Sequence, residues 1–251
     1  MLCNNIIEGN SRDGLLLKSS ESNSIFYNII ENNNDGIEIG SSNSNTISNN
    51  TIKDNTVNDN SDIAIFNHGI FTKIINNTVK YNEQDGIKIA SDGARSSISS
   101  NNLVDNEGKS IIILAKNIAI ESNTIDADSS EIAISILNAN FASIENNTIE
   151  GGNLGIKVQN STSAFIYNNT IKSNSGYGIQ VLINSESARV KYNQLTDNED
   201  NAIVISSSNS TEVYNNTIKE NAGYGFAATN SKLLNFKGNT NLELALIVGQ
   251  L

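Results

Sequence analysis

The chain has 251 residues, of which 37% are hydrophobic, with 7 Phe and no Trp, so its composition favours a thin aliphatic core over a thick aromatic one. The net charge of −11 repels the phosphates of nucleic acids and anionic lipid surfaces, so we expect no nucleic-acid partner. No linker divides the chain and no apolar stretch is long enough to span a membrane, so we expect one domain over residues 1–251, excerpted from a longer protein.

An asparagine followed two residues later by an aliphatic residue recurs about every 23 residues along the chain, a period typical of solenoids. These anchor asparagines are Asn5, Asn28, Asn50, Asn77, Asn101, Asn123, Asn147, Asn169, Asn193, Asn216 and Asn239. Asparagine tolerates the left-handed backbone of a tight bend, and its amide both donates and accepts hydrogen bonds. We therefore expect the anchors to stack as a ladder, with a second asparagine column five residues further on, as at Asn33.

Three short strands are predicted between successive anchors. After Asn28, the first strand points Ile30 inward, the second points Ile37 and Ile39 inward, and the third points Ile47 inward. The second strand is predicted to begin at Leu15, Ile37, Ile63, Ile87, Ile111, Ile132, Ile156, Ile179, Ile203 and Phe226. The fold class is therefore all-β: a single-stranded right-handed parallel β-helix of 10 to 11 coils, roughly 50 Å long at about 4.8 Å per coil.

With its asparagine columns and Asn-x-Ile-x-x-Asn unit, the chain resembles the parallel β-helix repeat (NosD-like) group of the pectate-lyase-like superfamily over residues 3–241. That superfamily includes polysaccharide lyases, hydrolases, uronate epimerases, phage tailspikes and surface proteins. The resemblance implies an extracellular or cell-surface location, a polysaccharide or surface-protein partner, and self-association as trimers or end-to-end stacks. A copper-maturation role, also known in the group, is disfavoured because one His, one Cys and one Met are too few soft ligands.

One coil is longer than the others, because the step from Asn50 to Asn77 is 27 residues. The excess falls in an acidic loop, residues 56–62, between turns that carry further aspartates. Clustered carboxylates repel unless a cation lies between them, and oxygen-rich acidic turns suit calcium. The candidate calcium ligands are Asp35, Asp59, Asp62 and Asp85. The alternative is that each aspartate only caps its own Asp-Gly turn.

Near this coil the outward residues of the second strand are predicted to be Glu38, Ala64 and Lys88, with His68 in the following bend. Lyases and epimerases of the superfamily need a cationic group to neutralise a uronate carboxylate and a base to remove its α-proton. His68, Lys88 and Arg95 are the candidate catalytic residues. The alternative is an ordinary solvated surface, and the proline-containing motif of alginate epimerases is absent because the chain has no proline.

Towards the C-terminus, Tyr167, Lys191 and Tyr214 are predicted to share an outward column on the third strand. Sugars stack on such rings, so these residues are the candidate glycan site, although exposed tyrosines are also common on pleated strands that bind no ligand.

The sequence predicts two alternative functions for the chain. The first is a β-helical surface or secreted module that binds glycan or another protein. The alternative is a polysaccharide lyase or uronate C5-epimerase that acts on acidic polysaccharide with calcium at the long coil.

Overall fold

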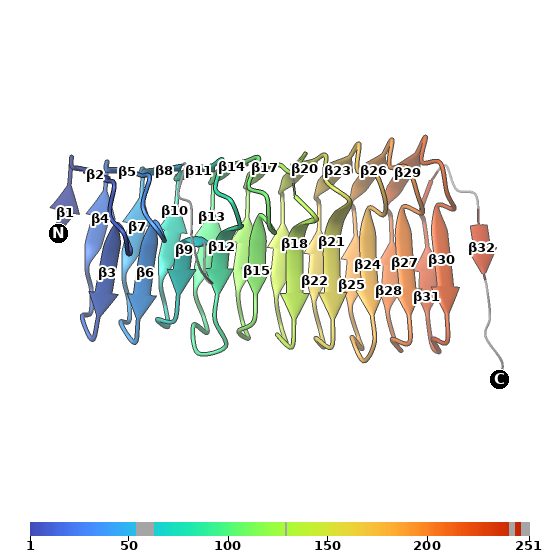
Figure 1. Cartoon of the computed structure of the whole chain (residues 1–251). Helices are drawn as coiled ribbons and strands as arrows, with labels where there is room; N and C mark the ends of the chain where they lie inside the picture. Colours follow the sequence, from blue (N-terminus) through green and yellow to red (C-terminus); the bar gives the residue numbers. More distant parts are fainter. Residues whose placement is uncertain (54–62, 129, 241–243, 247–251) are drawn as a thin grey trace.

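The computed structural model describes residues 1–53, 63–128, 130–240 and 244–246. Within these residues the chain forms 32 strands and no helix, and therefore none that could cross a membrane. The strands stack as the coils of one right-handed parallel β-helix with three strands per coil, so the predicted fold class is confirmed. Figure 1 shows the coils side by side along one axis, with β1 at one end of the rod and β32 at the other.

The first sheet, sheet A, contains the strand that leads into each anchor asparagine. Its parallel strands are β1 (Leu2–Cys3), β4 (Ser24–Phe26), β7 (Thr46–Ser48), β10 (Lys73–Ile75), β13 (Ser97–Ser99), β16 (Ala119–Glu121), β19 (Ser143–Glu145), β22 (Phe165–Tyr167), β25 (Arg189–Lys191), β28 (Glu212–Tyr214) and β31 (Asn235–Lys237). In most of these strands the central residue is buried and its two neighbours are more exposed, as in β22, where Ile166 points inward. This alternation is the period of two that the sequence predicted.

Sheet B follows each anchor. Its strands are β2 (Ile6–Glu8), β5 (Ile29–Glu31), β8 (Thr51–Lys53), β11 (Thr78–Lys80), β14 (Asn102–Val104), β17 (Thr124–Asp126), β20 (Thr148–Glu150), β23 (Thr170–Lys172), β26 (Gln194–Thr196) and β29 (Thr217–Lys219). The inward column of Ile30, Ile52 and their successors is fully buried, as predicted.

Sheet C completes the coil. Its strands are β3 (Leu15–Lys18), β6 (Ile37–Gly40), β9 (Ile63–Asn67), β12 (Asp85–Ile89), β15 (Ile111–Ile113), β18 (Ile132–Leu137), β21 (Leu154–Gln159), β24 (Ile179–Leu182), β27 (Ile203–Ser206), β30 (Phe226–Thr229) and β32 (Leu244–Leu246).

The predicted starts of the second strand at Ile63 and Ile132 are confirmed, but in these two coils the first residue of the strand does not pair with the first residue of the strand in the preceding coil. Ile37 pairs with Ile65 and not with Ile63, and Ile111 pairs with Ile134 and not with Ile132. In both coils an aliphatic residue stands two places before the paired one, so a period-two pattern fits either residue equally well. The choice is made by the pairing with β6 and β15, which begin at the residues that face Ile65 and Ile134.

The anchor asparagines form an unbroken hydrogen-bonded ladder from Asn5 to Asn239. Each side-chain Nδ2 donates to Oδ1 of the anchor in the next coil, and the backbone N–H donates to the same oxygen, as from Asn147 to Asn169. The ladder satisfies buried amides that have little access to water, so it stabilises the bend between sheets A and B.

A serine ladder at the bend between sheets C and A was not predicted. The backbone N–H groups of Ser161, Ser185 and Ser208 each donate to the hydroxyl oxygen of the serine in the next coil, which ends at Ser231. Serine is common in the whole sequence, so its recurrence at one bend is hard to separate from the background.

Candidate functional site

Fully buried aliphatic columns from all three sheets fill the interior of the coils. Side chains that could meet a ligand therefore lie on the outer faces of the sheets. Two such places, one on sheet C and one on sheet A, bring together several residues that the sequence analysis named.

The outward column of sheet C runs through Leu16, Glu38, Phe66 and Lys88 on successive strands. The prediction that Ala64 lies in this column is wrong, because Ala64 is 0% exposed. The register shift in β9 explains the error, since it places Phe66 between Glu38 and Lys88.

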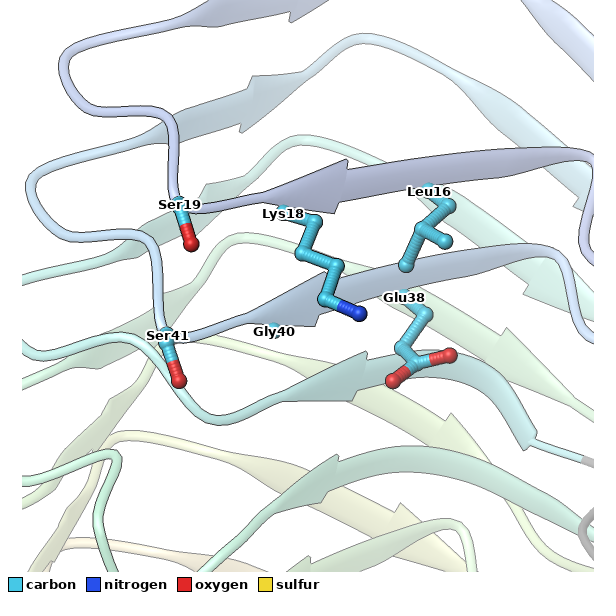
Figure 2. A pocket seen from close by; sticks show the side chains of 6 residues that line it. All are labelled: Leu16, Lys18, Ser19, Glu38, Gly40 and Ser41. Carbon is cyan, nitrogen blue, oxygen red and sulfur yellow. The ribbon is translucent and has the colours of Figure 1, made fainter.

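Beside this column the outer face of β3 and β6 is hollowed. The hollow, which we call the Gly40 pocket, has a volume of about 280 Å³. Its lining residues are Leu16, Lys18, Ser19, Glu38, Gly40 and Ser41. Figure 2 shows Leu16 above Glu38, Lys18 turned towards Glu38, and the two serines at the far side.

Glu38 is the acidic group of the pocket. Burial, the nearby Asp13 charge and a hydrogen bond with Asp13 raise the pKa of the Glu38 carboxyl above its ordinary value, and the charges of His68 and Lys18 act in the opposite direction. A carboxyl group with a raised pKa beside cationic side chains is a candidate acid or base.

Of the four predicted calcium ligands, the structure describes Asp35 and Asp85. Asp35 accepts the Ile63 N–H at 2.8 Å through Oδ1, and Asp85 accepts the Lys109 N–H at 2.9 Å, so each aspartate bonds to the backbone of the next coil. Asp59 and Asp62 lie outside the described residues.

A different acidic group forms among the described residues. Asp13, Asp35 and Glu38 each place one carboxylate oxygen within 4.8 Å of the others. This spacing is compatible with a cation, and Asp35, which is 4% exposed, is the most buried of the three.

Two of the predicted catalytic residues lie together on sheet C. The His68 ring is 4.3 Å from the Phe66 ring, and the Lys88 ammonium is 5.2 Å from the centre of the same ring. The Nδ1 atom of His68 also lies 3.0 Å from Oδ1 of Asp92, in an exposed pair. The histidine and the lysine therefore both lie beside Phe66, which pairs with Glu38 of the preceding coil.

Arg95 does not join them around Phe66. Its guanidinium lies 5.6 Å from the centre of the Phe71 ring. Arg95 follows the end of β12, in the bend that leads to sheet A, with a left-handed φ of 60°.

On sheet A, the predicted glycan residues Tyr167, Lys191 and Tyr214 occupy one outward column on three adjacent strands, as expected. The structure adds neighbours that complete a continuous cluster. We call this cluster the aromatic patch, and its members are Phe165, Tyr167, Arg189, Lys191, Tyr192, Glu212 and Tyr214.

Rings on β22 and in the bend after β25 contact each other in the aromatic patch. Phe165 and Tyr167 are stacked with centroids 5.3 Å apart and planes 18° apart, and Tyr192 meets Tyr167 edge-on at 5.3 Å. Such packing holds the rings in fixed positions, and all three side chains keep part of their surface in solvent.

Charged groups lie among these rings. The Lys191 ammonium is 2.6 Å from Oε2 of Glu212 and 5.0 Å from the centre of the Tyr214 ring, and Nε of Arg189 is 3.7 Å from the same Glu212 oxygen. The hydrogen bond from Lys191 is the main cause of a lowered pKa for the Glu212 carboxyl. Because Lys191 and Arg189 share the Glu212 carboxylate, some of their N–H groups can still donate to sugar oxygens.

A second, smaller hollow of about 180 Å³ lies on the same sheet C face as the Gly40 pocket, several coils away. Lys157, Tyr177 and Gln180 are among its lining residues. The nearby charge of Asp200, together with burial and a hydrogen bond with Asp200, raises the pKa of the Tyr177 hydroxyl.

Sequence reasoning missed Phe165, Arg189 and Glu212 on sheet A. They form the second outward column, two residues before Tyr167, Lys191 and Tyr214. Counting back two positions along each strand would have found them, because alternate residues share a face. Gly40 was missed for another reason: a pocket made by an absent side chain leaves no chemical motif in the sequence.

A family model described as a right-handed β-helix region matches residues 1–103 and 91–241. No curated protein matches the sequence.

Three solved structures illustrate the fold similarity. The A-module of a mannuronan C-5 epimerase from Azotobacter vinelandii has a TM-score of 0.65 at 14% identity, covering 96% of this chain and 81% of that one. The Dettilon tailspike protein has a TM-score of 0.77 at 13% identity, covering 95% of this chain and 55% of that one. The catalytic unit of an α-1,3-glucanase from Streptomyces thermodiastaticus has a TM-score of 0.64 at 10% identity, covering 92% of this chain and 51% of that one. This chain therefore spans about half the length of the last two.

Proposed function

Because this chain belongs to the right-handed β-helix family, we propose that it is a module that holds a polysaccharide on the aromatic patch of sheet A. The coils supply a rigid scaffold, and the outward side chains supply recognition. The observation that carries this proposal is the cluster of three contacting rings on β22 and after β25, beside the Lys191–Tyr214 contact on β25 and β28.

The chemistry of the patch suits a sugar chain. Aromatic rings offer apolar area to the C–H faces of sugars, and tyrosine hydroxyls offer a polar group beside it. Lys191 and Arg189 supply donors and Glu212 an acceptor, so hydroxyl groups on a bound sugar find both kinds of partner. Adjacent strands lie about 4.8 Å apart, which lets one extended chain contact several coils.

Two of the similar folds support a polysaccharide ligand by their names, one being a mannuronan epimerase and the other an α-1,3-glucanase. We infer an extracellular or cell-surface location, where such polymers are available, and the tailspike supports this inference. A protein partner is the competing ligand class for the same patch.

The test is affinity electrophoresis through gels that contain alginate, pectate or a neutral glucan. Tyr167→Ala and Tyr214→Ala should each weaken retention roughly 3- to 10-fold, the range expected for the loss of one aromatic contact. Tyr224→Ala is the matched control, because Tyr224 is an exposed tyrosine outside the patch. No retention in any gel, or equal loss in the control, would contradict the proposal.

An enzyme is the second candidate, acting as a lyase or uronate C5-epimerase on acidic polysaccharide. The observation in its favour is that His68 and Lys88 lie on the same face of sheet C as Glu38, whose pKa is raised by burial and by Asp13. The carboxylates of Asp13, Asp35 and Glu38 would repel the carboxylate of a uronate, so a bound uronate would need a bridging calcium ion. The oxygens of these three residues lie close enough together to bind one.

This candidate is tested with alginate and pectate, with and without calcium. Turnover is followed by the absorbance of unsaturated uronate and by the stereochemistry of the product. Activity that needs calcium and is lost in Lys88→Met and His68→Gln would establish the enzyme. Calcium should also raise the melting temperature in step with the logarithm of its concentration, and a flat response would remove the metal.

A further inference from the structure

The Gly40 pocket is a gap in an otherwise continuous row of side chains. Lys18 of β3 pairs with Gly40 of β6. In the next coil Asn67 pairs with Ile39, so the following residue, His68, faces Gly40. At this position β21 and β24 carry Gln159 and Leu182. A glycine between Lys18 and His68 therefore leaves a space that a side chain fills elsewhere on the face.

We propose that the Gly40 pocket binds one neutral sugar residue, a site distinct from the aromatic patch. The inference rests on the proposed function, because it assigns a second contact to the same class of ligand. The pocket belongs to sheet C and the patch to sheet A, so each can be tested without altering the other.

The size and the walls of the pocket fit a single ring. Its volume of about 280 Å³ lies just below the range of about 300–1,000 Å³ that holds drug-sized ligands. Leu16 is 49% exposed and forms an apolar wall for the C–H face of a ring. Lys18 can donate to a ring hydroxyl oxygen, and Glu38 can accept from two hydroxyl groups.

The charge around the pocket selects against an acidic sugar. Glu38 lines the pocket, and Asp13 and Asp35 each place one carboxylate oxygen within 4.8 Å of a Glu38 carboxylate oxygen. Lys18 is the cation of the lining, so a sugar carboxylate would meet more negative than positive charge. Hydroxyl groups carry no such penalty.

Gly40 offers a direct way to close the pocket. A Cβ atom at Gly40 would lie 3.7 Å from the Leu17 carbonyl oxygen and 3.8 Å from Oε1 of Glu38, which are ordinary contacts. Gly40→Leu should therefore fold and fill the space. Gln159→Leu places the same side chain at the equivalent strand position several coils away and serves as its control.

The experiment is saturation-transfer NMR with the methyl glycosides of glucose, galactose, mannose and glucuronic acid as probes. We expect transfer to at least one neutral glycoside and weaker transfer to the glucuronide. Gly40→Leu should weaken the neutral ligand at least tenfold, and Glu38→Gln should weaken it as well. Gln159→Leu should leave it unchanged.

Other outcomes separate the two proposals. No transfer to any neutral glycoside, while polysaccharide retention on the patch persists, would overturn the pocket and leave the proposed function intact. Transfer that survives Gly40→Leu and disappears in Tyr177→Ala would place the sugar in the smaller hollow and overturn the assignment. Tighter binding of the glucuronide would overturn the charge argument. Pocket binding without retention on any polysaccharide would count against the aromatic patch alone.

Discussion

Nδ2 of Asn147 donates to Oδ1 of Asn169 at 3.0 Å, and the backbone N–H of Asn147 donates to the same oxygen at 2.9 Å. The Asn147 amide also donates to the Ile120 carbonyl oxygen in the preceding coil at 2.9 Å. One side chain therefore connects three coils, and both asparagines are buried.

Asn147→Leu should lower the free energy of unfolding by about 1–3 kcal/mol, because it leaves buried donors and acceptors without partners. Urea denaturation followed by circular dichroism measures the change. Thr148→Ala alters an exposed residue of the same coil and should stay within about 0.5 kcal/mol. Equal effects of the two substitutions would contradict a structural role for the ladder.

Gly69→Ala should be strongly destabilising, whereas Gly40→Ala should not. A Cβ atom at Gly69 would lie 1.8 Å from the Ser42 carbonyl oxygen, so one of the two backbones must move. Overpacking of this kind costs about 1–3 kcal/mol or more. At Gly40 the nearest atoms would lie at ordinary contact distances of 3.7 and 3.8 Å, and the free energy of unfolding should change by less than about 1 kcal/mol. Similar urea midpoints for the two variants would show that the coil can relax around Gly69.

Glu38→Gln should become more stable relative to the natural chain as the pH rises. The folded-state pKa of Glu38 is raised above its ordinary value of 4.5, so its contribution to stability is fully present below 4.5 and is lost as the pH rises through the folded pKa. The difference in urea midpoint between the two chains, measured from pH 4 to pH 7, reports this trend. Glu83→Gln removes one exposed carboxylate and controls for net charge. If Glu38→Gln instead became less stable relative to the natural chain as the pH rises, burial and the Asp13 contact could not be raising the pKa of Glu38.

Lys191→Gln should raise the pKa of the Glu212 carboxyl towards its ordinary value of 4.5, because the hydrogen bond from Lys191 is the largest cause of its lowering. An NMR titration of the carboxyl carbon measures the change directly. The stability from this pair is present above 4.5 and is lost as the pH falls through the lowered pKa, and it should be small because both groups are partly exposed. Lys172→Gln, which removes the partner of Glu150 instead, should leave the Glu212 titration unchanged.

Much of the fold was readable from the sequence alone. The anchor asparagines and the inward isoleucines appear at fixed positions in each repeat, and the structure stacks them coil on coil. The shared column of Tyr167, Lys191 and Tyr214 was predicted for the same reason, since residues one repeat apart become neighbours in a solenoid.

Only the tertiary structure decided the register where the repeat is irregular. Ile63 and Ile65 fit the same period-two pattern, and the pairing of Ile65 with Ile37 placed Phe66 rather than Ala64 on the outer face. The contact of Glu38 with Asp13 and the pocket at Gly40 likewise depend on how side chains from different coils are oriented. Repetition in the sequence determines which residues stack, because each coil hydrogen-bonds to the next in register. Side-chain conformation and local changes in strand length determine what those residues touch, and both are settled by packing against neighbouring coils that no single repeat contains.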